Sequence, residues 1–171
     1  MTKKILLTGR PACGKTTLVK GIVAKLVLPA FGFYTEEIRK HSERVGFKIV
    51  TLDGEEAVLA HVDFNTRQRI GKYGLDLSGL ETIGVEAIRR AVRQRRVVVI
   101  DEIGPMELRS DIFRDATTET FDSRAPVLGT VTVRSFPFTN ALKRRPEVTL
   151  IEVRRDNRDQ LVSELSDQFR C

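Results

Sequence analysis

Nine residues near the N-terminus combine the residue types that hold a polyphosphate. The segment from Gly9 to Thr17 reads G-R-P-A-C-G-K-T-T and fits the pattern G-x-x-x-x-G-K-T of a phosphate-binding loop. Gly9 and Gly14 permit backbone angles and close approaches that a Cβ atom forbids, so backbone N–H groups can turn inward around an anion. Lys15 is expected to reach the β- and γ-phosphates, and the Thr16 hydroxyl to bind Mg²⁺. We therefore predict a nucleotide site at this loop.

Two adjacent acids form a second candidate for chemistry. Asp101 and Glu102 directly follow Val97-Val98-Val99-Ile100, an apolar run typical of a buried parallel strand. In open parallel sheets, ligands lie beyond the carboxyl ends of the strands, so both acids are expected beside the loop. Asp101 is then the Mg²⁺ partner of Thr16, and Glu102 is placed to orient and deprotonate a water aimed at the γ-phosphate. The alternative interpretation is a pair of surface acids that end a strand.

The predicted nucleotide contacts are the residues of the loop and the first of the two acids. They are Gly9, Arg10, Pro11, Ala12, Cys13, Gly14, Lys15, Thr16, Thr17 and Asp101. Thr16 and Asp101 are also the predicted Mg²⁺ ligands. Charge on the transferring phosphoryl group calls for a further cation. The sequence does not rank the four candidates, Arg10, Arg69, Arg134 and Arg145.

Three weaker signals lie near these motifs. Residues 101–104 read D-E-I-G and fit the D-x-x-G of GTPases, but no N-K-x-D segment is present to read guanine, so guanine selectivity is unsupported. Cys13 is interpreted as a small residue that the loop tolerates, with a thiol activated by the helix terminus as the alternative. Thr130 and Thr132 end an apolar run; they either sense the γ-phosphate or reflect the preference of β-branched residues for strands.

The elements that must hold these residues follow from hydrophobic periodicity. Strands are predicted at 4–8, 97–100, 126–131 and 148–153, and helices at 17–26, 80–93, 107–122, 136–145 and from 157 onward. Strands that alternate with helices indicate a three-layer α/β fold with a mostly parallel sheet. Residues 31–60 differ, because three extended segments there surround the turn signal Asp53-Gly54. We predict a small antiparallel extension at 31–60, a loop at 61–79, and a single domain over residues 1–171.

Length and composition indicate a globular protein. The chain has 171 residues, of which 41% are hydrophobic and 30% charged, which suits one domain with a full core. No apolar run approaches the roughly 20 residues of a membrane span. The two cysteines, Cys13 and Cys171, do not make a disulfide framework, and His41 and His61 have no partners at metal-ligand spacing. We expect a cytoplasmic monomer without a membrane segment and with no metal besides Mg²⁺.

The net charge of +6 raises the question of a nucleic-acid partner. Residues 89–96 read R-R-A-V-R-Q-R-R, which a basic stripe for RNA or DNA would explain. Cations near a helix C-terminus are also favoured by the helix dipole, and acidic residues are interleaved through most of the chain. Aromatic residues, which stack on bases, are absent from the stretch. We therefore favour solvated surface charge over nucleic-acid binding.

Several segments together resemble the THEP1 family of nucleoside-triphosphatases, also called cancer-related nucleoside-triphosphatases in animals. The likeness spans nearly the whole chain and keeps the order of the motifs. Its most specific blocks are F-Y-T-E-E at 33–37 and D-E-I-G-x-M-E at 101–107. Further matches are the loop, G-F-Y-T-E-E from 32, V-G-F at 45–47, R-I-G-K-Y at 69–73, the leucine at 108 and N-R at 157–158. Pro105 departs from the pattern, because animal members usually carry lysine there, so no phosphate contact from such a lysine is carried over.

The resemblance implies a RecA-like P-loop core and slow, Mg²⁺-dependent hydrolysis of ATP, GTP and other triphosphates. It also implies that the loop lysine and the glutamate after the acidic strand's aspartate carry catalysis, which here are Lys15 and Glu102. We predict a nucleoside-triphosphatase that accepts ATP, GTP, CTP and UTP. The alternatives are a small nucleotide or metabolite kinase and a nucleotide-dependent RNA-binding module. Against the kinase, the sequence shows no Arg-rich lid insertion and no acceptor site.

Overall fold

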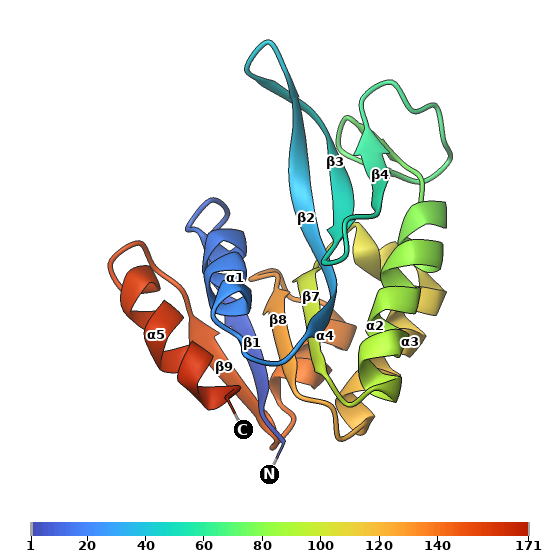
Figure 1. Ribbon diagram of the computed structural model, residues 1–171. Helices are drawn as coiled ribbons and strands as arrows, with labels where there is room; N and C mark the ends of the chain where they lie inside the picture. The colour runs from blue at the N-terminus through green and yellow to red at the C-terminus, as the bar shows by residue number, and fades with distance from the viewer. Residues whose placement is uncertain (1, 171) are drawn as a thin grey trace.

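The computed structural model describes residues 2–170, which form one nine-stranded sheet with helices against both faces (Figure 1). The strand order is β5-β6-β4-β3-β2-β7-β8-β1-β9. The strands are β1 (Lys4–Thr8), β2 (Ala30–Lys40), β3 (Glu43–Thr51), β4 (Glu56–His61), β5 (Arg69–Ile70), β6 (Tyr73–Leu75), β7 (Val97–Ile103), β8 (Val127–Val131) and β9 (Val148–Glu152). The helices are α1 (Lys15–Ala24), α2 (Val85–Arg93), α3 (Asp111–Asp122), α4 (Pro137–Lys143) and α5 (Arg158–Gln168). A π-helical turn η1 (Leu80–Gly84) precedes α2, and a 3₁₀ turn η2 (Glu107–Arg109) precedes α3.

Half of the sheet is parallel and forms the middle layer of three. The strands β2, β7, β8, β1 and β9 pair in parallel in that order. Because successive side chains of a strand point to opposite faces, Ile5 and Leu7 of β1 pack with α1 and α5, whereas Leu6 packs with α2 and α3. This is the predicted three-layer α/β class. One strand, β8, lies between β1, which leads into the loop, and β7, which carries the acids.

The antiparallel extension exists, but its boundaries differ from the prediction. β2 belongs to both halves of the sheet: Ala30–Tyr34 pairs in parallel with β7, and Phe33–Lys40 pairs antiparallel with β3. The extension also continues past residue 60, because β5 and β6 lie inside the predicted 61–79 loop. Gly71, with φ of +56°, turns the chain between them. This glycine therefore closes a short hairpin within the segment predicted to be a loop.

Two helices begin differently from the prediction because of their polar residues. The helix predicted at 107–122 is split, since the Ser110 hydroxyl accepts from the Phe113 N–H at 3.0 Å and starts α3 at Asp111. The last helix, predicted from 157 onward, begins one residue later at Arg158, and the Asn157 side chain does not cap it. Its amide instead accepts from the Arg154 N–H at 2.8 Å and donates to the Glu152 carbonyl at 3.0 Å. Asn157 therefore fixes the turn between β9 and α5.

The buried Lys4 is expected to stabilise the fold. Its Nζ donates to the carbonyl oxygens of Thr120 at 3.1 Å and Ser123 at 2.8 Å, which end α3, and burial lowers the pKa of this lysine. Lys4→Met keeps the apolar stem but removes the donor of the Ser123 carbonyl, whereas the Thr120 carbonyl still accepts from the Ser123 hydroxyl at 2.7 Å. The free energy of unfolding should therefore fall by about 1–2 kcal/mol. Denaturant titration is the measurement, with the exposed Lys3→Met as control. Equal midpoints for the two variants would contradict this role.

Candidate active site

The loop after β1 has the backbone geometry of an anion cradle. Ala12 and Gly14 adopt left-handed conformations, with φ of +60° and +98°, and such residues turn backbone N–H groups toward a shared concave face. Gly9 is needed because the loop backbone passes close to Val153, the residue after β9. A Cβ at Gly9 would lie 2.6 Å from the Val153 carbonyl oxygen. Lys15 Nζ donates to the carbonyl oxygens of Gly9 at 2.8 Å and of residue 10 at 3.3 Å. The loop therefore has the predicted phosphate-binding form.

The acidic strand meets this loop as predicted. Thr16 Oγ1 donates to Asp101 Oδ2 at 2.7 Å, which joins the start of α1 to the end of β7. The other carboxylate oxygen, Oδ1, accepts from Thr130 Oγ1 of β8 at 2.6 Å. Asp101 is only 2% exposed, and burial raises its pKa, while the two hydroxyl donors and the charge of Lys15 act in the opposite direction. The hydroxyl of Thr130 thus holds Asp101, which neither sequence-based interpretation of that residue anticipated.

Glu102 lies beside the loop lysine and against a glycine. Burial raises the pKa of its carboxyl group, and the positive charge of Lys15 opposes this shift. A Cβ at Gly104 would lie 2.6 Å from Glu102 Oε1 and 3.1 Å from Glu107 Oε2, so both carboxyl groups sit over this glycine. A partly desolvated carboxylate of raised basicity is suited to accept a proton from water.

Glu107 is a third acid of the site that we did not predict, because its sequence context indicated only the start of a helix. Its side chain is 4% exposed, and it accepts a long hydrogen bond of 3.4 Å from Thr35 Oγ1. Thr35 in turn donates to the backbone carbonyl of Asp101 at 2.7 Å. The acid and the threonine occur in the two blocks that carry the family resemblance, which is the signal that could have drawn attention to them.

Glu107→Gln is expected to change how stability depends on pH. Burial and the neighbouring Glu102 raise the pKa of Glu107 from 4.5 to about 8. The folded protein thus keeps a proton that the unfolded chain loses above pH 4.5. The stability that the protonated Glu107 contributes is fully present below pH 4.5 and is lost as the pH rises through about 8. Over this range the free energy of unfolding falls by at most about 1.4 kcal/mol per pH unit.

Glutamine is neutral throughout, so the variant should gain stability over the wild type at pH 8 and none at pH 4.5. Denaturant titrations with EDTA at several pH values measure this difference. Burial also raises the pKa of Asp101 and of Glu102, so the stability of the variant still depends on pH. We therefore expect a plot of its unfolding free energy against pH to be less steep than that of the wild type, but not flat. Parallel curves for the two proteins would contradict the burial of a proton at Glu107.

The four candidate arginines fall into two groups. Arg10 in the loop and Arg134 just after β8 are exposed and lie at the carboxyl ends of the parallel strands. Arg69 donates to carbonyl oxygens of residues 64 and 72, and so holds its own hairpin at the far edge of the sheet. Arg145 pairs with acids 122 and 147 and precedes β9, which places it at the opposite end of the parallel strands. The structure therefore brings only Arg10 and Arg134 to the side of the phosphate loop.

A further arginine, from helix α5, packs against the phosphate loop. A Cβ at Gly14 would be 2.7 Å from Arg158 Cδ and 2.8 Å from its Nη1, so the guanidinium of α5 covers the start of α1. Its sequence position, at the beginning of the last helix, does not reveal this, because α1 and α5 pack together only in the folded sheet. Its Nε pairs with Asp159 at 3.2 Å, so this arginine adds a partly neutralised positive charge beside the predicted phosphates.

The residues at the junction of loop and acidic strand fit Mg²⁺. Among residues 2–170, no cluster of three or more His, Cys, Asp and Glu side chains makes an all-protein metal site. Mg²⁺ is commonly held by one or two protein oxygens, with waters and substrate phosphates completing the octahedron. The Thr16 hydroxyl and Asp101 carboxylate, 2.7 Å apart beside the phosphate loop, supply that kind of donor set.

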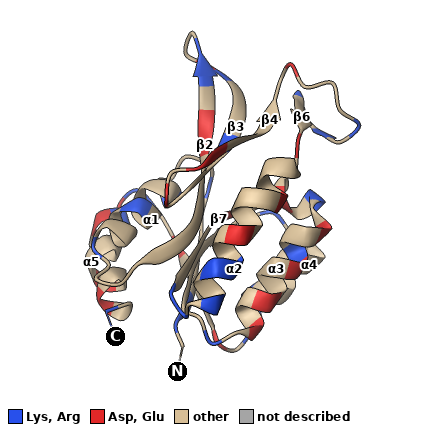
Figure 2. Cartoon of the chain, turned by 45° about the vertical axis from the view of Figure 1, so that its right-hand side comes forward, with Lys and Arg blue, Asp and Glu red and all other residues tan. Residues whose placement is uncertain are grey.

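The basic stretch at residues 89–96 lies on and after α2, away from the phosphate loop. Figure 2 shows acidic residues beside the basic ones on α2 and α3. Three ion pairs join the basic stretch 89–96 to acids, Arg89–Glu119, Arg90–Asp53 and Arg93–Glu86. This neutralisation supports the interpretation as surface charge. Cys13 belongs to the phosphate loop, and its side chain is buried in the core with residues of α1 and α5, as suits a small packing residue. Cys171 lies outside the described residues.

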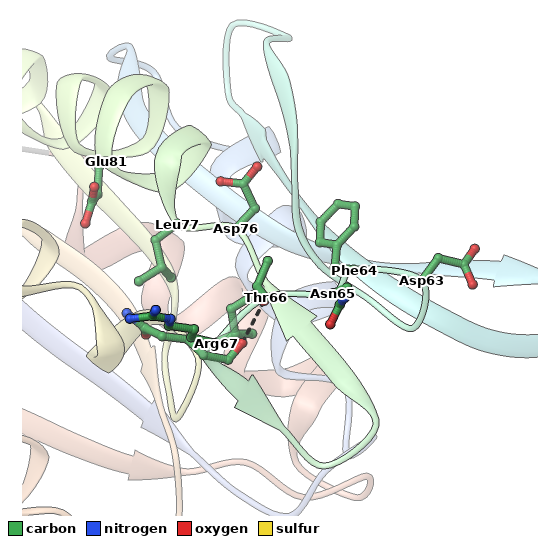
Figure 3. Close-up of a pocket in the computed structure, with 10 residues that line it drawn as sticks. Asp63, Phe64, Asn65, Thr66, Arg67, Asp76, Leu77 and Glu81 are labelled. Atoms are coloured by element: carbon green, nitrogen blue, oxygen red, sulfur yellow. Dashed lines mark hydrogen bonds between the residues drawn. The ribbon is translucent and has the colours of Figure 1, made fainter.

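A separate cavity of about 530 Å³ lies in the antiparallel extension (Figure 3). Its wall includes Arg67, Asp76 and Glu81, and none of the predicted site residues lines it. The Thr66 hydroxyl donates to the Gln68 carbonyl at 2.9 Å and so holds one side of the cavity opening.

Within residues 2–170, no helix is both long and apolar enough to cross a bilayer.

Comparisons with known proteins agree with this geometry. Residues 4–166 match a family model described as NTPase. The nucleoside-triphosphatase THEP1 of Thermotoga sp. strain RQ2 is 46% identical over 162 residues, which cover 95% of this chain and 92% of that protein. A crystal structure of THEP1 from Aquifex aeolicus superposes with a TM-score of 0.90 at 36% identity, over 97% of this chain and 98% of the other. The solution structure of a human cancer-related nucleoside triphosphatase gives 0.83 at 33% identity, over 98% and 97%.

These similarities cover nearly the full length of both partners in each comparison, so they concern the whole fold rather than the phosphate loop alone. They include the antiparallel extension and the β9–α5 turn as well as the parallel core. The chain belongs to the THEP1 family of nucleoside-triphosphatases.

Proposed function

We propose that this protein hydrolyses nucleoside triphosphates to the diphosphate and phosphate, in a Mg²⁺-dependent reaction that accepts ATP, GTP, CTP and UTP. The observation that carries the proposal is the 2.7 Å hydrogen bond between Thr16 and Asp101, which brings the phosphate loop and the acidic strand into one site. The names of the relatives, nucleoside-triphosphatase THEP1, agree with it.

The residues divide the work of phosphoryl transfer. Backbone N–H groups of residues 10 and 12–16, since the proline at 11 has none, and the Lys15 ammonium hold the β- and γ-phosphates. Thr16 and Asp101 would hold Mg²⁺, which when bound offsets negative charge on the phosphates. Glu102 orients a water molecule and accepts its proton as the water oxygen bonds to the γ-phosphorus and the bond to the β–γ bridging oxygen breaks. Arg134 is the exposed cation nearest in sequence to the end of β8 and is our choice to offset the remaining charge.

Phosphate release from ATP, GTP, CTP and UTP, with Mg²⁺ or with EDTA, tests the proposal. We expect release from all four with rates within about one order of magnitude, and none with EDTA. Lys15→Ala is the matched control, because loss of the ammonium should weaken both binding and turnover.

Two outcomes would favour the alternatives instead. Release that requires an added hydroxyl acceptor would indicate a kinase, since water would then not be the natural nucleophile. Turnover that appears only with RNA would indicate a nucleotide-dependent RNA-binding module. Release without either addition contradicts both.

A further inference from the structure

A cavity of about 490 Å³ adjoins the phosphate loop on the side away from the catalytic acids. One wall is residues 10–13 of the loop, and the other is residues 152–155 of the β9–α5 turn. These segments are far apart in sequence but lie side by side at the carboxyl end of the parallel sheet (Figure 1). The volume lies within the range of roughly 300–1,000 Å³ that is usual for small-molecule sites.

The strand order sets the direction of a bound nucleotide. β7, which carries Glu102, and β9, which carries this cavity, lie on opposite sides of β1. The γ-phosphate must lie toward Glu102, because the attacking water is held there. The nucleoside end of the same molecule must then leave the loop on the β9 side, where the cavity opens.

The cavity wall is rich in guanidinium groups. Arg10 lies on the loop wall, and Arg154 and Arg155 lie on the turn wall, with Glu152 as the acid of the lining. Arg154 pairs with acid 156 at 3.1 Å. Within residues 2–170, Arg10 and Arg155 have no carboxylate partner within salt-bridge distance, so two uncommitted planar cations stand on opposite walls.

The turn that carries Arg155 is held in place. As described above, Asn157 bonds to the backbone on both sides of it, at residues 152 and 154. The next residue, Arg158, rests on Gly14 of the loop. The two walls are therefore fixed relative to each other by the α5 start, which gives a cavity of defined width.

We infer that this cavity binds the nucleoside end of the substrate, with the base stacked between the guanidinium planes of Arg10 and Arg155. Guanidinium groups stack on aromatic faces, and every base offers such a face. Recognition by stacking does not read the hydrogen-bonding edge of the base, so it accounts for acceptance of all four nucleotides. The inference rests on the proposed function for the orientation of the nucleotide, and it assigns Arg10 to the base rather than to the γ-phosphate.

The test measures by calorimetry how tightly the protein binds ADP, UDP and pyrophosphate. Because pyrophosphate has no base, it reports binding by the phosphate loop alone, whereas ADP and UDP also report binding by the cavity. Arg155→Ala and Arg155→Lys should each weaken ADP roughly tenfold and UDP somewhat less, since the purine offers the larger face. Lysine keeps the charge but lacks the plane, so it should not restore ADP binding. Pyrophosphate affinity should be unchanged in Arg155→Lys. Arg124→Ala, an exposed arginine that precedes β8 at the other end of the sheet, is the control.

The failures are distinguishable. If Arg155→Lys binds ADP like the wild type, or if ADP and pyrophosphate weaken equally, the cavity does not stack the base and the inference is wrong. If Lys15→Ala leaves both ligands bound normally, the loop does not hold phosphates, and the proposed function fails first. Thermal melting of each variant confirms that the exposed substitutions leave the fold intact.

Discussion

Glu102→Gln is expected to lower the rate of triphosphate hydrolysis by about 10²–10⁴-fold while leaving Mg·ATP binding within a few-fold of the wild type. Glutamine keeps the shape of the side chain over Gly104 but cannot accept the proton of the attacking water. The phosphate contacts come from the loop and Lys15, so affinity should persist. The measurements are single-turnover phosphate release and calorimetric titration with Mg·ATP.

The matched control is Glu119→Gln, a surface acid of α3 whose partner is Arg89. It removes the same charge far from the loop, and its turnover should equal that of the wild type. A near-normal rate in Glu102→Gln would show that another group accepts the proton. A parallel loss of binding and rate would instead show that Glu102 acts in holding the metal-bound substrate.

Gly32→Ala is expected to have the largest effect on stability. Gly32 has φ of +137° and pairs with Val99 in the parallel ladder between β2 and β7. A Cβ there would lie 1.8 Å from the Val99 carbonyl oxygen, which is backbone that cannot rotate away. The free energy of unfolding should fall by more than about 4 kcal/mol, to the point of losing the cooperative transition.

Gly54→Ala separates strain from steric overlap. Gly54 also has a left-handed φ, of +98°, but a Cβ there meets nothing within 4 Å. Its substitution should cost only about 1 kcal/mol, the conformational penalty for a residue with a side chain. Denaturant titration of both variants, with soluble yield where no transition remains, is the measurement. Similar midpoints for the two would contradict the close approach of β2 and β7.

The parts of the site that could be predicted from the sequence are those encoded by neighbouring residues. The phosphate loop is contiguous, so its spacing alone indicates its conformation. Asp101 and Glu102 end an apolar run, and the rule that parallel strands present their carboxyl ends together places them beside the loop. The helices and four of the five parallel strands follow from periodicity for the same reason, apart from end residues set by local bonds such as that of Ser110. The fifth, β2, was predicted only as part of the antiparallel extension, because its parallel pairing with β7 is a contact between distant segments.

What could not be predicted depends on contacts between distant segments. Glu107 becomes an acid of the site only because η2 brings it back beside Gly104, and Arg158 covers the loop only because α5 packs on α1. Thr130 was indistinguishable in sequence from any β-branched strand residue until β8 was placed next to Asp101. The need for glycine at position 32 arises from the neighbouring strand, not from a turn.

The placement of β8 between the two halves of the site has a consequence for assembly of the enzyme. The two hydroxyls on Asp101 come from positions 85 and 29 residues away along the chain. Bringing such distant segments together costs loop-closure entropy before any contact repays it, so this carboxylate acquires its partners only once the parallel ladder is complete. A peptide that spans either motif alone lacks the other's oxygens. Tight binding of magnesium and nucleotide should therefore appear late in folding. The moment at which it appears during refolding would report when β1, β8 and β7 pair.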